Sequence, residues 1–536
     1  MNIKKIRTVQ VLFLVVFVGF VSNLYGFNLV SSVTYNGSAN SNDFLLGVCF
    51  SSYTNTFYAV GYSSESVTTG NDVHIRRYDP ALNLISSVTY NYSGASDDRG
   101  YDVTVDSLGN VYAVGSVNSD ADIIILKYSP NLNFISSQTF NVSSQESAYG
   151  VTIDTVTGNL YIIGYVYVAA GDNDILVMKY SPDITFISSA AISGGASLEV
   201  GEDIIYDQSL GLYITGRYRI SNLDFWVARL DVNTLLPIWT HAIAGDSGLT
   251  DSGYGLVIGD NNVYVTGYID NSAGGVDILI SKYDPTLTLL SSTTFAGGGL
   301  NADRGYGIDY FNNKVYLTSQ FFTTNQDIRS FEIDTTLKVI SSTTFNGSGN
   351  GADTGYDVAV KDSDNIFVVG KIFNGINDDM LIIKYEKPPI LSISISTNTF
   401  DFGLLTISTS VVSISSIVVI NDGNVVQRYK LKCTSTTPSI WAPVSGAPSA
   451  DEFRLLCVFN STSPVVNDFE PANDYLAPAD TDRTSSPTVF SGPSGETGDN
   501  VPVSATRGLW LRLDTPPSSV NNQQTTTLTI TAEQQP

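Results

Sequence analysis

A short pattern recurs along this chain at a nearly constant spacing: an aromatic residue, two further residues and then glycine, as in YAVG and YITG. Successive copies lie 49 to 54 residues apart. Such regular spacing over most of the sequence indicates a repeat architecture, in which each repeat is one supersecondary unit. The seven copies end at Gly61, Gly115, Gly164, Gly216, Gly267, Ser319 and Gly370.

Each repeat contains four runs that are typical of β-strands. In the second repeat they cover 100–106, 110–117, 122–130 and 134–141. Val, Ile, Tyr, Phe and Thr dominate the runs, and turn-forming residues fill the gaps between them. Four strands in about 50 residues are typical of a propeller blade. A linear β-solenoid is the competing repeat, but its turns are usually much shorter.

The number of strands predicts how the ring closes. The seventh repeat ends after its third strand, near 381–389, and lacks a fourth. A spare fourth strand, LVSSVTYN at 29–36, stands before the first repeat and matches ISSVTYN at 85–91. We therefore predict an all-β, seven-bladed β-propeller over 28–387, in which the N-terminal strand completes the last four-stranded blade. Glycine or alanine opens every first strand except the one that begins at Leu45, which suits the crowded innermost position.

The repeats resemble a known family. GYDVTVDSLGNVYAVG, DIIILKYSPNLNFISS and ARLDVNTLLPIWTHAIAG are similar to the bacterial SBBP-type beta-propeller repeats of exported proteins. The resemblance covers 28–387 and implies a propeller fold with a surface-associated or unassigned function. No catalytic motif comes with it. Ser319 and Glu332 depart from the pattern, since glycine and a basic residue are usual at these positions.

Acidic residues recur at two positions of every repeat. One reading of the first set is a ring of carboxylates at one end of the channel that attracts Ca²⁺. The other reading, which we favour, is structural, with each carboxylate accepting backbone N–H groups. The first set is Asp43, Asp98, Glu146, Glu199, Asp251, Asp303 and Asp353. The second is Asp72, Asp122, Asp174, Asp224, Asp277, Asp327 and Asp379. Five residues later most repeats carry a base, which we expect to cover an inter-blade surface: Arg77, Lys127, Lys179, Arg229, Lys282 and Lys384.

The sequence offers little for catalysis. There are two histidines and no spacing typical of a transition-metal site, so we expect no metal centre and no cofactor, with Ca²⁺ as the one candidate ion. Neither a G-x-S-x-G elbow nor a P-loop is present. The fourth repeat deviates most. Its unusual residues suggest a sugar- or peptide-contacting patch, although buried packing explains the tryptophans as simply. They are Arg217, Trp226, Trp239 and His241.

The N-terminus has the features of a secretory signal. Basic residues precede a 13-residue apolar run from Val9 to Val21, which is short for a bilayer-spanning helix. We predict a signal peptide over 1–26 with cleavage near 22–26, and an uncleaved membrane anchor is the alternative. No later segment is apolar enough to span a membrane. The formal charge of −25 argues against nucleic-acid binding, because such a surface repels phosphates.

The repeat period disappears after residue 389. Alternating apolar residues in short runs over 390–536 predict a β-sandwich. FDFGLL and SSIVVINDGN resemble the first strands of Ig-like domains appended to bacterial surface proteins. Cys433 and Cys457 fall on the apolar phase of two strands, which fits either a disulfide or two buried thiols. Cys49 is expected in the core.

These features together predict an exported protein, secreted or held at the cell surface, with no transmembrane segment after signal cleavage. We expect it to bind protein or glycan partners there and not to be an enzyme. One alternative is a carbohydrate-active hydrolase or lyase with its acids on the channel face. Another is a structural spacer in a surface layer.

Overall fold

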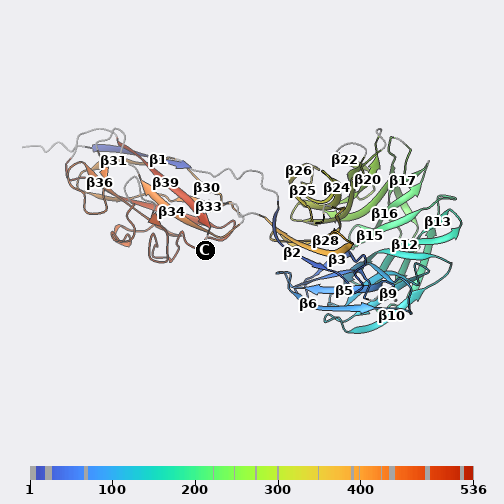
Figure 1. Ribbon diagram of the computed structural model, residues 1–536. Helices are drawn as coiled ribbons and strands as arrows, with labels where there is room; N and C mark the ends of the chain where they lie inside the picture. The colour runs from blue at the N-terminus through green and yellow to red at the C-terminus, as the bar shows by residue number, and fades with distance from the viewer. Residues whose placement is uncertain are drawn as a thin grey trace, which may run out of the picture. The chain divides into compact units, whose positions relative to one another are not determined.

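The computed structural model describes residues 8–17, 27–65, 70–220, 222–246, 248–271, 275–297, 301–347, 349, 351–387, 391–397, 399–423, 425–433, 441–476, 483–518 and 524–534. The chain divides into two compact units (Figure 1). One unit comprises 24–388, and the other comprises 1–23 together with 389–536. Each unit is described by itself below.

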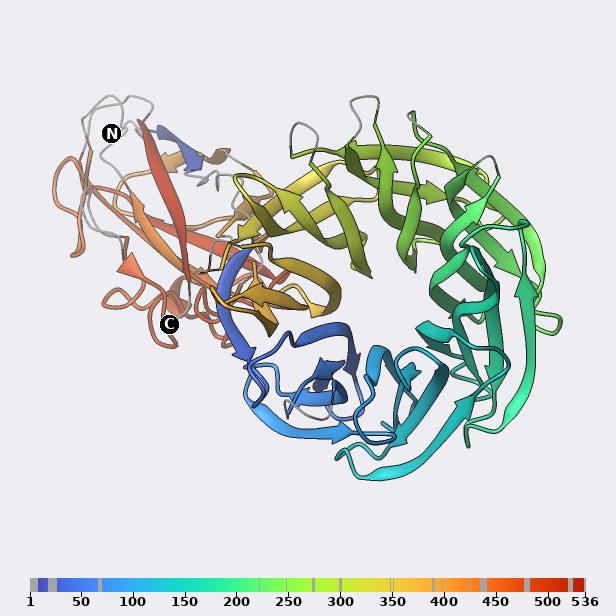
Figure 2. The same cartoon turned by 45° about the vertical axis from the view of Figure 1, so that its right-hand side comes forward.

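The described part of 24–388 forms seven four-stranded antiparallel sheets, arranged in a circle as the blades of a propeller (Figure 2). The innermost strands are β3 (Phe44–Ser51), β7 (Arg99–Val105), β11 (Glu146–Ile153), β15 (Val200–Asp207), β19 (Ser252–Gly259), β23 (Arg304–Phe311) and β27 (Thr354–Asp362). The second strands are β4 (Thr56–Ser63), β8 (Val111–Val117), β12 (Leu160–Ala169), β16 (Gly211–Arg219), β20 (Asn262–Asp270), β24 (Lys314–Phe322) and β28 (Asn365–Phe373).

The outer half of each blade is built in the same way. The third strands are β5 (Asp72–Tyr78), β9 (Asp122–Tyr128), β13 (Asp172–Tyr180), β17 (Leu223–Leu230), β21 (Val276–Tyr283), β25 (Gln326–Asp334) and β29 (Asp378–Glu386). The outermost strands are β6 (Leu84–Tyr90), β10 (Phe134–Phe140), β14 (Phe186–Ile192), β18 (Pro237–Ile243), β22 (Leu289–Phe295), β26 (Val339–Phe345) and β2 (Asn28–Tyr35). The four strands per repeat expected from the sequence are therefore confirmed.

The ring closes as predicted. Strand β2 pairs antiparallel with β29, so the seventh sheet has the order β2-β29-β28-β27. Val33 lies opposite Ile382, and Tyr35 lies opposite Met380. The first described strand of the propeller thus completes its last blade, which removes two open sheet edges at the seam.

The blades are held together by apolar side chains on both faces of each sheet. Strands β8 and β9 are buried along their whole length. One face of blade two packs against blade three, where Val114 and Ile125 share a buried cluster with Ile162 and Met178. An isolated blade would expose both of its faces to water, and each large apolar side chain left exposed costs roughly 1.5–3 kcal/mol. This explains why the sequence repeats the unit.

The glycine that ends each YAVG-type pattern is required by backbone packing. A Cβ atom on Gly115 would collide with the carbonyl oxygen of Arg99 on the neighbouring innermost strand. Blade six carries Ser319 at this position. The strands pair there with the same irregularity as in the other blades, and the Ser319 hydroxyl donates to the carbonyl oxygen of Arg329 at 2.8 Å. The backbone of the third strand therefore satisfies the hydroxyl that replaces the usual glycine.

The recurrent basic residues lie between blades, as expected. Lys127 Nζ donates to the carbonyl oxygen of Pro182 in the next blade at 2.8 Å, and Lys282 Nζ donates to that of Thr335 at 2.8 Å. Glu332 replaces the base in blade six and accepts instead from Lys314, 2.7 Å away. The exchange of charge is therefore compensated locally.

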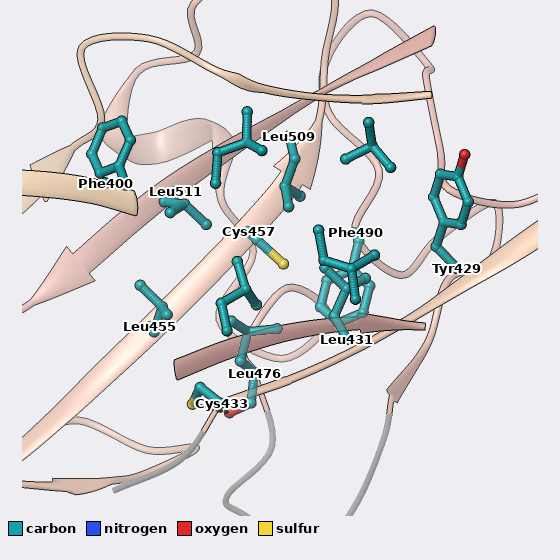
Figure 3. Packing of buried hydrophobic residues seen from close by; sticks show 14 of the residues in the cluster. Phe400, Tyr429, Leu431, Cys433, Leu455, Cys457, Leu476, Phe490, Leu509 and Leu511 are labelled. Atoms are coloured by element: carbon teal, nitrogen blue, oxygen red, sulfur yellow. Dashed lines mark hydrogen bonds between the residues drawn. The ribbon is translucent and has the colours of Figure 1, made fainter. Parts of the chain in front are cut away.

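The second unit is all-β apart from the short 3₁₀ helix η1 (Val466–Asp468) in its described residues. One sheet has the order β31 (Thr399–Thr406), β1 (Thr8–Phe17), β39 (Gln524–Gln534), β34 (Gln427–Cys433) and β37 (Arg483–Thr484). The other has the order β30 (Ile393–Ile395), β33 (Ile417–Asn421), β38 (Thr506–Asp514), β36 (Glu452–Phe459) and β35 (Ala442–Pro443), with β32 (Ser410–Val412) on β38. Both sheets contribute to one buried apolar cluster (Figure 3).

Strand β1 comes from the apolar core of the predicted signal peptide. It lies between β31, to which it runs antiparallel, and β39, to which it runs parallel. The expected cleavage region, 22–26, lies outside the described residues. Within the residues that are described, we find no helix with the length and hydrophobicity needed to cross a bilayer. Signal cleavage stays a prediction.

Cys433 and Cys457 are both buried in the shared cluster. Burial raises the pKa of the Cys433 thiol to about 12 and raises that of Cys457 well above its usual value. The two sulfur atoms point in different directions (Figure 3). A disulfide between them stays a prediction. Cys49, on the innermost strand β3, packs against the cluster between the first two blades.

Candidate functional site

Each innermost strand places one residue at the same level of the central channel. Five of the seven are tyrosines, and together they line a cavity of about 100 Å³. We call this set the tyrosine ring. Its members are Leu46, Tyr101, Tyr149, Glu202, Tyr254, Tyr306 and Tyr356. No motif distinguishes these residues in the sequence, although all of them follow the small or apolar residue that opens each first strand.

The tyrosines contact one another around the channel. The rings of Tyr101 and Tyr149 meet edge to face with centroids 4.7 Å apart, and those of Tyr254 and Tyr306 stack at 4.8 Å. Such aromatic pairs favour these geometries because the ring faces are negative and the edges positive. Burial raises the pKa of Tyr306 to about 12, so its hydroxyl stays protonated at neutral pH. The tyrosine ring therefore offers the channel an aromatic surface with neutral hydrogen-bond donors.

An ion pair breaks the symmetry of the ring in blade four. Glu202 takes the place of a tyrosine, and Arg217 Nη1 lies 3.2 Å from its Oε1. Burial raises the pKa of Glu202 to about 7, and Arg217 opposes this rise. Arg217 also donates from Nε to the carbonyl oxygen of Leu198 at 3.2 Å, which fixes its orientation. This pair gives the channel one charged, directional side.

Behind the tyrosine ring, half-buried aspartates connect neighbouring blades. Asp102 accepts hydrogen bonds from the backbone N–H of Val103 at 2.7 Å and from that of Val151, in the next blade, at 2.8 Å. Burial raises the pKa of Asp102 to about 6. The same bridge to the following blade is made by Asp203 to Leu256, Asp309 to Val360 and Asp357 to Val48. These carboxylates therefore have a structural role.

Glycines make room for the bridges. A Cβ atom on Gly47 would approach Asp102 too closely, and one on Gly307 would do the same to Asp357. Aspartate on one blade and glycine on its neighbour thus form a matched pair at these junctions.

The first set of recurrent acids is buried, and all of its members except Glu199 are seen to accept hydrogen bonds from backbone amides. Asp303 accepts from the N–H of Gly297 and of Phe322, both at 2.6 Å. Asp353 accepts in the same way from Gly347 at 2.6 Å and Phe373 at 2.9 Å. Each such carboxylate thus ties the loop before its blade to the end of the second strand. A carboxylate held in this way has few lone pairs left for a ligand in the channel.

The four residues proposed from blade four do not form one patch. Trp226 is 2% exposed and stacks on Tyr218 at 4.8 Å. Trp239 is 40% exposed on the outermost strand β18, and the Arg229 guanidinium lies 4.7 Å from its ring. His241 lies on the same strand, 5.2 Å from the ring of Tyr283. Of the four, Arg217 is the one that pairs with a residue lining the channel cavity, Glu202.

The fold and the site together define a β-propeller with an aromatic, ion-paired channel. No family model matches the sequence, and no curated protein matches it significantly. Similar solved structures include the Dos1 propeller, 9% identical over 67% of this chain and 95% of that one, with a TM-score of 0.41.

Two further structures have a comparable likeness. The β-propeller domain of the Trilobed protease from Pyrococcus furiosus is 8% identical over 64% of this chain and 93% of its own, with a TM-score of 0.40. A putative 6-phosphogluconolactonase from Bacteroides uniformis is 14% identical over 63% of this chain and 100% of its own, with a TM-score of 0.40. Likeness at this level says nothing about what the chain binds.

Proposed function

We propose that this protein is an exported, non-catalytic binding protein that contacts a glycan or protein partner through the channel face of its propeller. The observation that carries the proposal is the tyrosine ring with its single ion pair. Five tyrosines at one repeat position supply aromatic surface, and the Glu202–Arg217 pair supplies direction. Tyrosine and arginine are favoured at binding surfaces because they combine large contact area with hydrogen bonding.

The size of the cavity bears on the kind of ligand. At about 100 Å³ it is smaller than the roughly 300–1,000 Å³ of pockets that enclose a small molecule. A partner would therefore rest on the channel face and insert only a side chain or the edge of a sugar. This favours a polymer or a protein over a free metabolite.

A hydrolase or lyase is the second candidate, and Glu202 is the observation in its favour. A carboxyl with a pKa raised to about 7 suits a general acid. Glycoside cleavage usually needs a second carboxyl at the same cavity. The other acids that line it, Asp102, Asp203 and Asp357, each accept two backbone hydrogen bonds, one from the next residue and one from the following blade. Binding is therefore the better supported function.

A structural spacer is the third candidate. Most outermost strands begin with two apolar residues that are exposed, such as Leu84 with Ile85 and Phe134 with Ile135. A rim of this kind favours association with a surface or with other copies. Sedimentation of the purified chain at increasing concentration measures this directly, and a monomer throughout argues against the spacer.

We also propose that the propeller is of the SBBP type, that the second unit is an Ig-like sandwich and that the protein is exported. The resemblance of the repeats supports an SBBP-type propeller, and the short alternating strands after residue 389 support an Ig-like sandwich. The signal-like N-terminus supports export to the cell surface. N-terminal sequencing of the exported protein tests the last of these.

The function is tested with purified full-length protein and a panel of glycans, cell-wall polymers and extracellular proteins, measured by calorimetry and by product release. We expect binding without turnover, weakened at least tenfold by Tyr306→Ala or Arg217→Gln. Tyr92→Ala is the matched control, because that side chain is exposed beyond the outermost strand β6. Turnover that Glu202→Gln abolishes would replace the binding proposal with the hydrolase.

A further inference from the structure

Three carboxylates converge where blade three meets blade four, away from the tyrosine ring. Asp172 and Asp174 open strand β13, and Glu199 immediately precedes strand β15. One oxygen atom from each lies within 4.8 Å of the other two. No ion pair joins any of the three to a lysine or arginine in the part of the chain that the structure describes. Three like charges at this spacing repel one another unless a proton or a cation intervenes.

The buried oxygen atoms point to a ligand independently of the count of charges. Glu199 is 0% exposed, and its Oε1 accepts from the Ser197 hydroxyl at 2.5 Å. Its Oε2 is also buried and has no hydrogen-bond partner among the described residues, and the same holds for Oδ1 of Asp174. A buried carboxylate oxygen with no partner loses its hydration without compensation.

In blades one and two a side-chain amide satisfies the corresponding aspartate. Asp72 Oδ1 accepts from Asn91 at 2.6 Å in blade one, and Asp122 accepts from Asn118 at 2.6 Å and from Asn141 in blade two. In blade three Ser193 occupies the position of Asn141. No amide donates to Asp174 among the described residues.

The negative charge at the position of Asp172 is balanced by a basic residue in blade two but not in blade three. Asp120 of blade two corresponds to Asp172, and the guanidinium of Arg99 lies 3.1 Å from it. Blade three carries Ser147 at the position of Arg99. Blade three has therefore lost both the amide and the guanidinium and kept every carboxylate.

We propose that Asp172, Asp174 and Glu199 bind one Ca²⁺ ion. Calcium prefers oxygen ligands at about 2.3–2.6 Å, so two ligands on opposite sides of the ion lie roughly 5 Å apart. Oxygen atoms within 4.8 Å of one another can therefore reach a shared ion. Water completes the coordination. Leu198, beside Glu199, accepts the hydrogen bond from Arg217, so the ion also restrains the segment that orients this side chain. The site does not depend on the proposed binding function.

The proposal is tested on the metal-free full-length protein by calorimetry with Ca²⁺ and by Tb³⁺ luminescence. Tyr218 and Trp226 provide the sensitiser, because the charges of Glu199 and Asp174 already act on Tyr218. We expect wild type to bind one ion that Asp174→Asn and Glu199→Gln each weaken at least tenfold. Asp122→Asn, the equivalent change in blade two, leaves that ion in place.

Several outcomes would overturn the proposal. The proposal is wrong if wild type binds no Ca²⁺, or if the Asp174→Asn variant binds Ca²⁺ as tightly as wild type. Equal losses in Asp174→Asn and Asp122→Asn would mean general attraction to an acidic surface. If wild type binds no ion and the Glu199→Gln variant melts at a higher temperature than wild type, a proton takes the place of the ion. Circular dichroism verifies folding, and Asp172→Asn, a half-buried position, replaces any variant that does not fold.

Discussion

Asp357 accepts a hydrogen bond from the backbone N–H of Val48 at 2.8 Å, although 309 residues separate them. The two residues lie on the innermost strands of the last and the first blade. This contact closes the ring on the channel side, while the pairing of β2 with β29 closes it on the outside. The first and last blades are thus joined both beside the channel and at the outer edge of the ring.

Loss of the Asp357 carboxylate should destabilise the propeller. Asp357→Ala leaves the N–H groups of Val48 and Val358 without an acceptor, and each buried donor left unpaired costs about 1–3 kcal/mol. Relief from burying a charge offsets part of this, so we expect a net loss of about 2 kcal/mol in denaturant unfolding. Asp364→Ala, at an exposed loop position, should change stability by less than about 0.5 kcal/mol. Equal stability of the two variants would contradict the role of the bridge.

The propeller should be more stable in mildly acidic solution than at neutral pH. Burial raises the pKa of Asp203 to about 7 and those of Asp102 and Asp309 to about 6. In the unfolded chain these carboxyls ionise near pH 4, roughly their ordinary value. Between about pH 4 and 7 the folded state therefore binds more protons than the unfolded state, and stability falls as the pH rises.

Calorimetry at several pH values measures this slope. We expect a higher melting temperature at pH 5 than at pH 8, and a flatter profile in Asp203→Asn. Asp364→Asn should keep the slope of wild type, because that side chain is exposed. A melting temperature that rises from pH 5 to pH 8 would show that folding does not raise the pKa values of the bridging carboxyls.

Glycine and serine should not be interchangeable at the last position of the YAVG-type pattern. Gly115→Ser places a Cβ atom against the carbonyl oxygen of Arg99 and should unfold blade two or cost several kcal/mol, about the range of overpacked sites. Ser319→Gly removes only the hydrogen bond to Arg329 and should cost about 1 kcal/mol. Thermal unfolding of both variants checks this, and similar costs would mean that backbone packing at Gly115 does not exclude a side chain.

The architecture was predictable because burial on both faces of every blade leaves a strong periodic signal. Val111 to Val117, for example, are apolar or small throughout and prove to be buried throughout. The spare strand at 29–36 followed from counting strands. The recurrence of acids in all blades has a related cause, since a need common to all blades recurs in all blades, and their structural role stays a prediction.

The channel was not predictable in the same way. Tyr101 and Tyr306 read as ordinary strand residues, and nothing in a single repeat indicates that they face a shared axis. Comparison of the repeats would have shown five tyrosines and one glutamate at this position. Trp226 and Trp239 are close in sequence, but they lie on the third and the outermost strand of the blade, whereas the tyrosine ring lies on the first strands.

The closed ring is tested most directly by hydrogen exchange of the full-length protein, followed by mass spectrometry. The account predicts that backbone amides in Asn28–Tyr35 exchange as slowly as those in Leu84–Tyr90, the equivalent outermost strand of blade one. Proline at both Val33 and Thr34 removes whichever of these two neighbouring amides donates to β29, and should accelerate exchange in both Asn28–Tyr35 and Asp378–Glu386. Exchange of Asn28–Tyr35 at the rate of an unstructured peptide in the unsubstituted protein would contradict the ring and the channel built on it.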